Sequence, residues 1–149
     1  MLHLRNLVRS AGRITLALPI LAMVGIFCLS QIPGNQLPAW NVSGMSVGNL
    51  LHFPVYFVLA TTWILALESR GVPRIKACWL AVVFAATFGA LDEVHQHFVP
   101  LRSMDPWDAV VNLAGATCAA LCWEWFRPLF FAPATPRDDN AVPPGPAAN

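Results

Sequence analysis

The chain has 149 residues, of which 56% are hydrophobic and 11% are charged, so its composition is far from that of an average soluble domain. The formal net charge of +1 argues against nucleic-acid binding, which needs clustered excess Lys and Arg. No Asp, Glu, Lys or Arg occurs in the 54 residues from Ile14 to Leu67, enough for two membrane passes of about 20 residues each. The composition predicts a multi-pass membrane protein.

The N-terminus has a basic leader before its first apolar run, as a signal peptide does. The run ends near Ser30 without a small-residue cleavage site, which favours retention. We therefore expect residues 1–13 to be a basic cytoplasmic segment and residues 14–29 to form a first span that stays in the membrane.

Three further spans are placed by length, over residues 49–67, 75–94 and 106–126. A helix rises about 1.5 Å per residue, so the uncharged stretch 77–91 is too short to cross a core of about 30 Å. The third helix must continue through Asp92 and Glu93, and the fourth must include Asp108 or Glu124. Acids at this depth face protein or a wet cavity. The fold class predicted is all-α, a four-helix transmembrane bundle.

Lys and Arg are distributed unevenly about these spans. With the N-terminus inside, eight of the nine lie in cytoplasmic segments and only Arg102 lies outside. Both termini are therefore predicted to be cytoplasmic, and the segment between the third and fourth spans extracytoplasmic. Residues 14–131 form the membrane domain in this scheme, and residues 132–149, rich in Pro and Ala, are expected to be a disordered tail.

Polar residues concentrate between residues 91 and 115. On a helix, Asp92, His95 and Gln96 share one face, and Glu93 pairs with His97 on the next face. Three interpretations stay open: half of a metal site, an acid and base pair, or hydrogen bonds that join helices or hold a ligand. We favour the hydrogen bonds and predict no metal and no cofactor.

Asp105 followed by Pro106 is typical of a helix start, with the acid as the N-cap. From Asp108 a stripe continues through Asn112 and Gly115, which permits close helix packing and could equally line a site.

Two basic side chains are predicted at the same outer level. Arg102, among four acids, is either a salt-bridge partner or a fork for a phosphate or carboxylate. His52 stands alone at the start of the second span, where ionisable groups are commonly functional.

These residues belong to short motifs that read, in chain order, Ser30-Gln31-Ile32-Pro33-Gly34, His52-Phe53 with Tyr56, Asp92-Glu93-x-x-Gln96, Phe98-Val99-Pro100, Arg102-Ser103 and Asp108-x-x-x-Asn112-x-x-Gly115. As a set, over about residues 14–126, they resemble the VanZ-like membrane protein family. The resemblance implies a compact four-helix protein of the cell membrane whose shared polar residues converge at the outer surface. It also implies a cell-envelope role, because the name-giving member is associated with low-level resistance to the antibiotic teicoplanin, a glycopeptide.

The chain departs from the family pattern at two places. The family usually has Asp-Lys four and three residues before the second-span histidine, where this chain has Gly48 and Asn49. Leu101 replaces the glycine that usually precedes the arginine. The missing Asp-Lys pair argues against any activity that needs an extra charge beside His52.

The preferred hypothesis is an envelope protein that binds a polar or anionic headgroup at the extracytoplasmic face, with a cell-wall lipid intermediate or a glycopeptide as the ligand. Its candidate ligand-binding residues are His52, Asp92, Glu93, Gln96, Arg102, Asp108 and Asn112. The alternative is a membrane enzyme that acts on a lipid-linked phosphate or ester through Asp92 or Glu93 and a histidine. No P-loop, GxSxG, HExxH or dinucleotide fingerprint supports an enzyme, so no catalytic residue is assigned.

Overall fold

The computed structural model describes residues 2–36, 41–42 and 45–131, with side chains for residues 15–36 and 51–131. Its described helices are α1 (Leu2–Ser30), α2 (Val47–Glu68), α3 (Arg74–Gln96) and α4 (Pro106–Phe126), with short 3-10 turns at η1 (Gly34–Gln36) and η2 (Arg127–Leu129). Two antiparallel strands of two residues each, β1 (Asn41–Val42) and β2 (Met45–Ser46), precede α2. They are too short to form a layer, so the predicted all-α class is confirmed. The predicted tail lies outside the described residues.

The helix boundaries agree closely with the predicted spans except at the N-terminus. Helix α4 covers the predicted residues, and α2 and α3 extend at most two residues beyond theirs at either end. Helix α1 begins at Leu2 and so includes the basic leader. The reason is local, because no proline interrupts the helix before Pro19 and the leader is rich in Leu and Arg, which favour helix.

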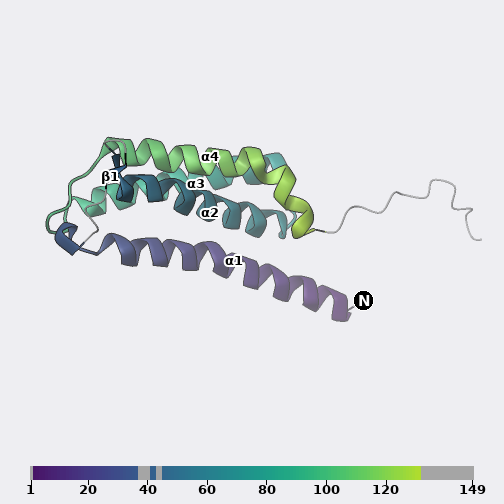
Figure 1. Cartoon of the computed structure of the whole chain (residues 1–149). Coiled ribbons are helices and arrows are strands. Elements are labelled where there is room, and N and C mark those ends of the chain that lie inside the picture. Colours follow the sequence, from purple (N-terminus) through teal and green to yellow (C-terminus); the bar gives the residue numbers. More distant parts are fainter. Residues whose placement is uncertain (1, 37–40, 43–44, 132–149) are drawn as a thin grey trace, which may run out of the picture.

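Three helices are long and apolar enough to cross a membrane, over Leu51–Glu68, Arg74–Gln96 and Pro106–Leu129. The apolar part of α1 with described side chains, Thr15–Ser30, is shorter. Helix α2 packs against all three other helices, most extensively against α4. The N-terminal end of α1 and the C-terminal end of α4 lie at the same end of the bundle (Figure 1). The chain is a helical membrane bundle, and which end faces the cytoplasm stays a prediction.

The start of α4 follows the predicted capping pattern. Asp105 has an extended backbone with φ of −115°, and its carboxylate accepts a hydrogen bond from the Trp107 backbone N–H at 2.9 Å. Pro106 is the first helical residue, where its missing N–H costs nothing. Asp108 then lies in the first turn, at the positive end of the helix dipole.

Small residues let the helices approach closely. On α4 the predicted stripe is buried, and a Cβ atom at Gly115 would lie 2.3 Å from the Phe53 carbonyl oxygen of α2. Helix α3 has a matching stripe, which the sequence analysis missed, with every fourth residue small and buried: Ala77, Ala81, Ala85 and Gly89. Close backbone packing of this kind is how helices associate in lipid, where apolar side chains gain little by leaving the bilayer.

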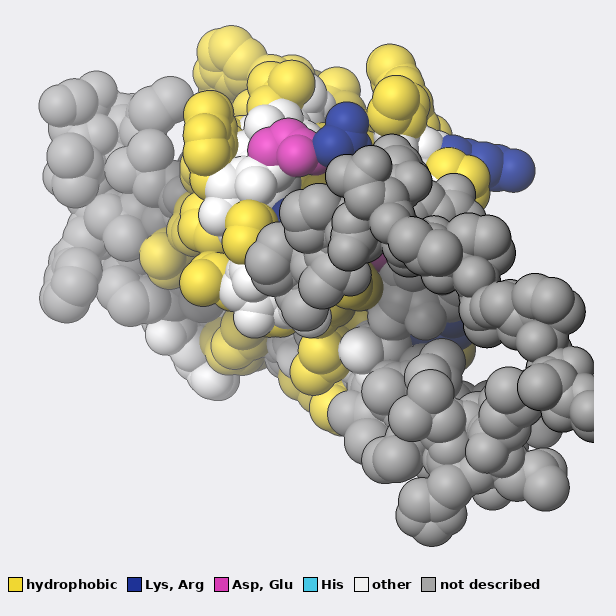
Figure 2. Space-filling model, turned by 90° about the vertical axis from the view of Figure 1, so that its right-hand side faces the viewer, with side chains coloured by type: hydrophobic (Ala, Val, Ile, Leu, Met, Phe, Trp, Pro, Cys, Tyr) yellow, Lys and Arg dark blue, Asp and Glu magenta, His cyan; other side chains and the backbone are white. Residues whose placement is uncertain are grey.

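The bundle end that carries the α1 N-terminus also carries an acid, Glu68, whose side chain is 6% exposed. Its carboxylate accepts from Trp123 Nε1 at 2.8 Å and from Arg127 Nε at 3.1 Å. Trp123 is therefore a core residue, whereas Trp125 is exposed. Seen from this end of the bundle, acidic and basic side chains lie among hydrophobic ones (Figure 2). Arg74, at the start of α3, forms an ion pair with Glu124, near the end of α4.

We expect Gly115→Ala to lower the free energy of unfolding by about 1–3 kcal/mol, because the added methyl group meets the α2 backbone and forces the helices apart. The measurement is an unfolding titration in mixed detergent micelles. Gly25→Ala is the matched control, since Gly25 is also helical but a Cβ there meets nothing within 4 Å. Equal behaviour of the two variants would contradict the packing argument.

Candidate functional site

The polar residues gather where the C-terminal ends of α1 and α3 meet the N-terminal ends of α2 and α4. We call this set the polar cluster; it consists of Ser30, His52, Tyr56, Asp92, Glu93, Gln96, Arg102, Asp108 and Asn112. All seven candidate residues from the sequence belong to it. Segments far apart in the chain therefore meet at one end of the bundle.

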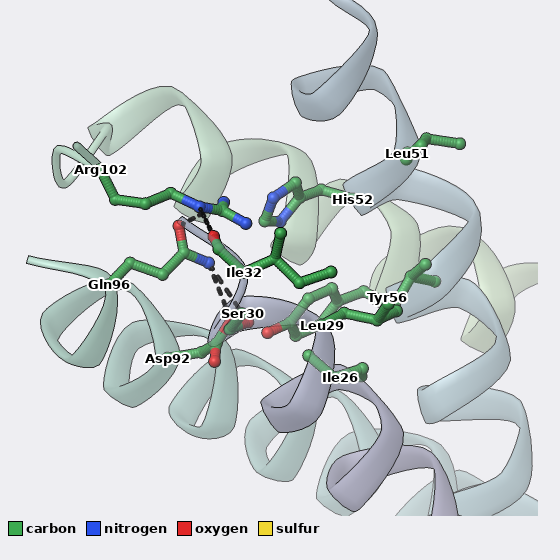
Figure 3. Close-up of a pocket in the computed structure, with 11 residues that line it drawn as sticks. Ile26, Leu29, Ser30, Ile32, Leu51, His52, Tyr56, Asp92, Gln96 and Arg102 are labelled. Carbon is green, nitrogen blue, oxygen red and sulfur yellow. Dashed lines mark hydrogen bonds between the residues drawn. The ribbon is translucent and has the colours of Figure 1, made fainter. Parts of the chain in front are cut away.

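One half of the cluster is a hydrogen-bonded chain that ends on Asp92. Ser30 Oγ donates to Asp92 Oδ2 at 2.7 Å, and Gln96 Nε2 donates to the same oxygen at 3.0 Å. Arg102 Nη1 donates to Gln96 Oε1 at 3.2 Å, and its Nε donates to the Ile32 carbonyl oxygen at 3.2 Å (Figure 3). The chain joins α1, α3 and the loop that follows α3.

The other half brings together α2, α3 and α4. His52 Nδ1 lies 2.9 Å from Asn112 Oδ1, and His52 Nε2 lies 3.7 Å from Asp108 Oδ2. Glu93 Oε2 accepts a hydrogen bond from the Asp105 backbone N–H at 3.2 Å. One ligand-type atom from each of His52, Glu93 and Asp108 lies within 4.8 Å of the other two.

Several polar atoms of the cluster are buried and have no hydrogen-bond partner among the described residues. They are Tyr56 Oη, Asp92 Oδ1, Glu93 Oε1, Asp108 Oδ1 and Asn112 Nδ2. Native proteins pair the great majority of such groups, because burying an unpaired polar atom costs about 1–3 kcal/mol. A concentration of unpaired atoms in one place is therefore the pattern of a site that receives a ligand.

Two pairings inferred from helical spacing are wrong. His95 does not join Asp92 and Gln96; its Nε2 lies 3.1 Å from Gln31 Nε2, and its ring packs on Phe27. The side chains of Glu93 and His97 do not pair either: the His97 backbone N–H donates to the Glu93 carbonyl at 3.3 Å, and the exposed His97 ring lies edge-on against Phe98. Helical spacing gives the face of a residue, but the neighbouring helices decide which atoms it meets.

A pocket of about 180 Å³ lies beside the cluster, between α1, α2 and α3. Its walls are mostly apolar, formed by Ile26, Leu29, Ile32, Leu51 and Val55. Its polar end is formed by Ser30, His52, Asp92, Gln96 and Arg102, with Tyr56 also in the lining. The side chains of Arg102 and His52 point toward one another across it (Figure 3). A cavity with an apolar wall and a polar end suits an amphipathic molecule.

The sequence model of the VanZ/LLP1 family matches residues 7–127, which is most of the chain and includes the whole polar cluster. The chain belongs to the VanZ/LLP1 family. No curated protein matches the chain. No solved structure matches it either. The resemblance inferred from the short motifs is thereby confirmed.

Two close contacts in this VanZ/LLP1 family member were not anticipated from the sequence. A Cβ atom at Gly89 would lie 3.0 Å from both Asn112 Nδ2 and Tyr56 Cε1, so a glycine there lets α2 and α4 bring polar side chains against α3. A Cβ at Gly34 would overlap the Leu101 carbonyl oxygen, and the Gly34 N–H donates to the Pro100 carbonyl at 3.2 Å. Ser30 and Tyr56 were visible in the motifs but were not singled out as site residues.

The backbone at Leu101 shows why the VanZ-like pattern has a glycine at this position. Its φ of 59° lies in the left-handed region, which glycine enters at no steric cost. This turn directs the following residue, Arg102, back to the polar end of the pocket. The family's usual glycine at this position is therefore the residue that the turn favours.

We expect Leu101→Gly to raise the free energy of unfolding by about 0.5–1 kcal/mol, because relief of a left-handed leucine exceeds the added entropy of the unfolded chain. Met104→Gly, in the same loop but without a positive φ, should lower it. Thermal unfolding in detergent compares the two. A destabilised Leu101→Gly variant would show that the leucine side chain contributes more than the turn costs.

Proposed function

We propose that this VanZ/LLP1 family member binds the polar or anionic headgroup of a membrane amphiphile at the extracytoplasmic face of the cell membrane. A cell-wall lipid intermediate is the ligand class that we favour. The observation that carries the proposal is the pocket, whose apolar wall meets a polar end formed by Ser30, His52, Asp92, Gln96 and Arg102. Membrane helices surround it, so a ligand dissolved in the bilayer has its apolar part beside the apolar wall.

The volume of the pocket limits which part of a ligand can enter it. At about 180 Å³ the pocket is smaller than the roughly 300–1,000 Å³ of sites that enclose a drug-sized ligand. It suits a headgroup or a short part of a chain and leaves the rest of the amphiphile in the bilayer. This supports recognition of one group on a larger molecule.

Arg102 is the side chain that we assign to the headgroup. Its Nη1 and Nε each donate one hydrogen bond within the protein, to Gln96 and to the Ile32 carbonyl, which fixes the plane of the guanidinium. Arginine has five N–H donors in a rigid fork, so donors remain for a phosphate or carboxylate. Asp92 accepts from Ser30 and Gln96 and so orients Gln96, which in turn holds Arg102.

The alternative function, an enzyme acting on a lipid-linked phosphate or ester, has one observation in its favour. Ser30 Oγ donates to Asp92 Oδ2 at 2.7 Å at the edge of the pocket, as a hydroxyl nucleophile and its base would. The same contact fixes the end of α1 against α3. Product formation from a polyprenyl phosphate ester, lost in Ser30→Ala, would favour the enzyme over headgroup binding.

We expect Arg102→Ala to weaken binding of a polyprenyl phosphate by about 10-fold to 100-fold, since charge-assisted hydrogen bonds contribute about 1.5–3 kcal/mol. Native mass spectrometry of the purified full chain, with phosphatidylcholine as the competing lipid, measures the change. Arg74→Ala is the matched control, because Arg74 pairs with Glu124 near the other bundle end. If the Arg102→Ala variant bound the polyprenyl phosphate as well as wild type, the proposal would be wrong.

The envelope role is tested in cells. In a susceptible host that lacks related proteins, wild type should raise the teicoplanin concentration needed to stop growth, and an Asp92→Asn, Arg102→Ala double variant should not. The matched control removes the Arg74–Glu124 ion pair with Arg74→Ala and Glu124→Gln. If the first double variant protects as well as wild type, the polar cluster has no part in glycopeptide resistance.

A further inference from the structure

Three side chains of metal-ligand type converge next to the pocket from three different helices. His52 comes from α2, Glu93 from α3 and Asp108 from α4, and one ligand atom of each lies within 4.8 Å of the other two. We infer that these residues bind one divalent transition-metal ion, for which Zn²⁺ is the reference. The inference concerns the ion alone and does not depend on the proposed headgroup ligand.

The histidine is oriented as a ligand. With the Asn112 amide oxygen 2.9 Å from His52 Nδ1, that nitrogen carries the proton and donates to Asn112. The lone pair is then on Nε2, which lies 3.7 Å from Asp108 Oδ2. Metal-bound histidines almost always donate their second ring N–H to an oxygen acceptor in this way, because it fixes the tautomer and the ring plane.

Glu93 and Asp108 each have one carboxylate oxygen without a hydrogen-bond partner among the described residues. Glu93 is 3% exposed and Asp108 7%, and Glu93 Oε1 and Asp108 Oδ1 are buried without a hydrogen-bond partner among the described residues. The other Glu93 oxygen accepts from the Asp105 backbone N–H, which holds the carboxylate in place. In the part of the chain whose side chains are described, neither acid lies within ion-pair distance of a Lys or Arg.

A bound cation would stabilise this arrangement of two buried carboxylates. Two neighbouring buried carboxylates at membrane level are costly unless they are neutralised. A divalent ion would neutralise both and use the unpartnered oxygens. One imidazole with two carboxylates is a ligand set that Zn²⁺ and similar transition metals accept, whereas Mg²⁺ and Ca²⁺ prefer oxygen alone.

The spacing requires a small closure. Ligands at about 2.0–2.1 Å from a tetrahedral ion lie about 3.4 Å apart. The Nε2–Oδ2 separation of 3.7 Å is near this value, and the 4.8 Å limit on the set leaves a closure of at most about 1.4 Å, which rotation of the Glu93 side chain can supply. Three protein ligands leave a fourth position for water or another ligand.

The test is metal uptake by the purified full chain in detergent. After treatment with a chelator, the protein is titrated with Zn²⁺, and bound metal is counted by plasma mass spectrometry after desalting. We expect one Zn²⁺ per chain, and a loss of affinity of about 100-fold or more in Glu93→Gln and Asp108→Asn. Asn112→Leu, which removes the acceptor that orients His52, should lose about 10-fold to 100-fold, and Asn112→Asp should keep the affinity.

The controls match each ligand by residue type. His97→Asn is compared with His52→Asn, and Glu124→Gln with Glu93→Gln, because His97 and Glu124 are exposed and outside the cluster. A Cys118→Ser, Cys122→Ser variant tests the thiol pair, whose sulfur atoms lie 3.9 Å apart. The His97→Asn, Glu124→Gln and double cysteine variants should each bind one Zn²⁺ per chain, as wild type does.

X-ray absorption of Zn²⁺-loaded wild type covers the case in which a ligand variant fails to fold. One imidazole and oxygen ligands at about 2.0–2.2 Å, without sulfur, is the expected shell. No uptake by wild type, a shell that contains sulfur or lacks imidazole, or uptake unchanged in a folded His52→Asn or Glu93→Gln variant would overturn the inference.

Discussion

The structure depends on one constraint, that polar side chains at membrane level must find their partners inside the protein. Asp92 meets it by accepting from both Ser30 and Gln96, and Gln96 in turn holds Arg102. The contact between His52 and Asn112 needs the backbones of α2 and α4 to be close as well, which Gly115 permits. Small residues and polar residues are thus parts of one arrangement, in which close packing brings the hydrogen-bonding groups within reach.

Charge connects the two proposals. Asp92 lines the pocket together with Arg102, and a negative carboxylate there would repel an anionic headgroup. A divalent ion held by His52, Glu93 and Asp108 would neutralise the two carboxylates on the side of the pocket that His52 lines. Arg102 faces His52 across the pocket (Figure 3), so a phosphate between them would meet the guanidinium without the opposing charge of Glu93 and Asp108. A neutral polar headgroup, by contrast, gains less from the ion.

The sequence predicted what depends on local chemistry and on length. Asp105 and Pro106 define the start of α4 through a local side-chain cap and a proline at the first helical position, so that boundary was predictable to the residue. The grouping of the polar residues was predictable too, because they lie at the ends of otherwise apolar spans and those ends meet on one side of the membrane. Their partners were not predictable. Glu93 lies one residue from Asp92, yet Asp92 meets Ser30 of α1 and Glu93 meets the backbone N–H of Asp105 just before α4, since a step of one residue turns the side chain by about 100°.

The two ends of the bundle give the strongest argument that the polar cluster is a site. Near one end, Glu68, whose side chain is mostly enclosed, has both oxygens paired, with Trp123 and Arg127. At the other end, Asp92, Glu93 and Asp108 each keep one oxygen without a partner among the described residues. The same fold thus pairs both oxygens of an enclosed carboxylate near one end. The unpaired oxygens at the other end are the observation on which the inferred metal site rests.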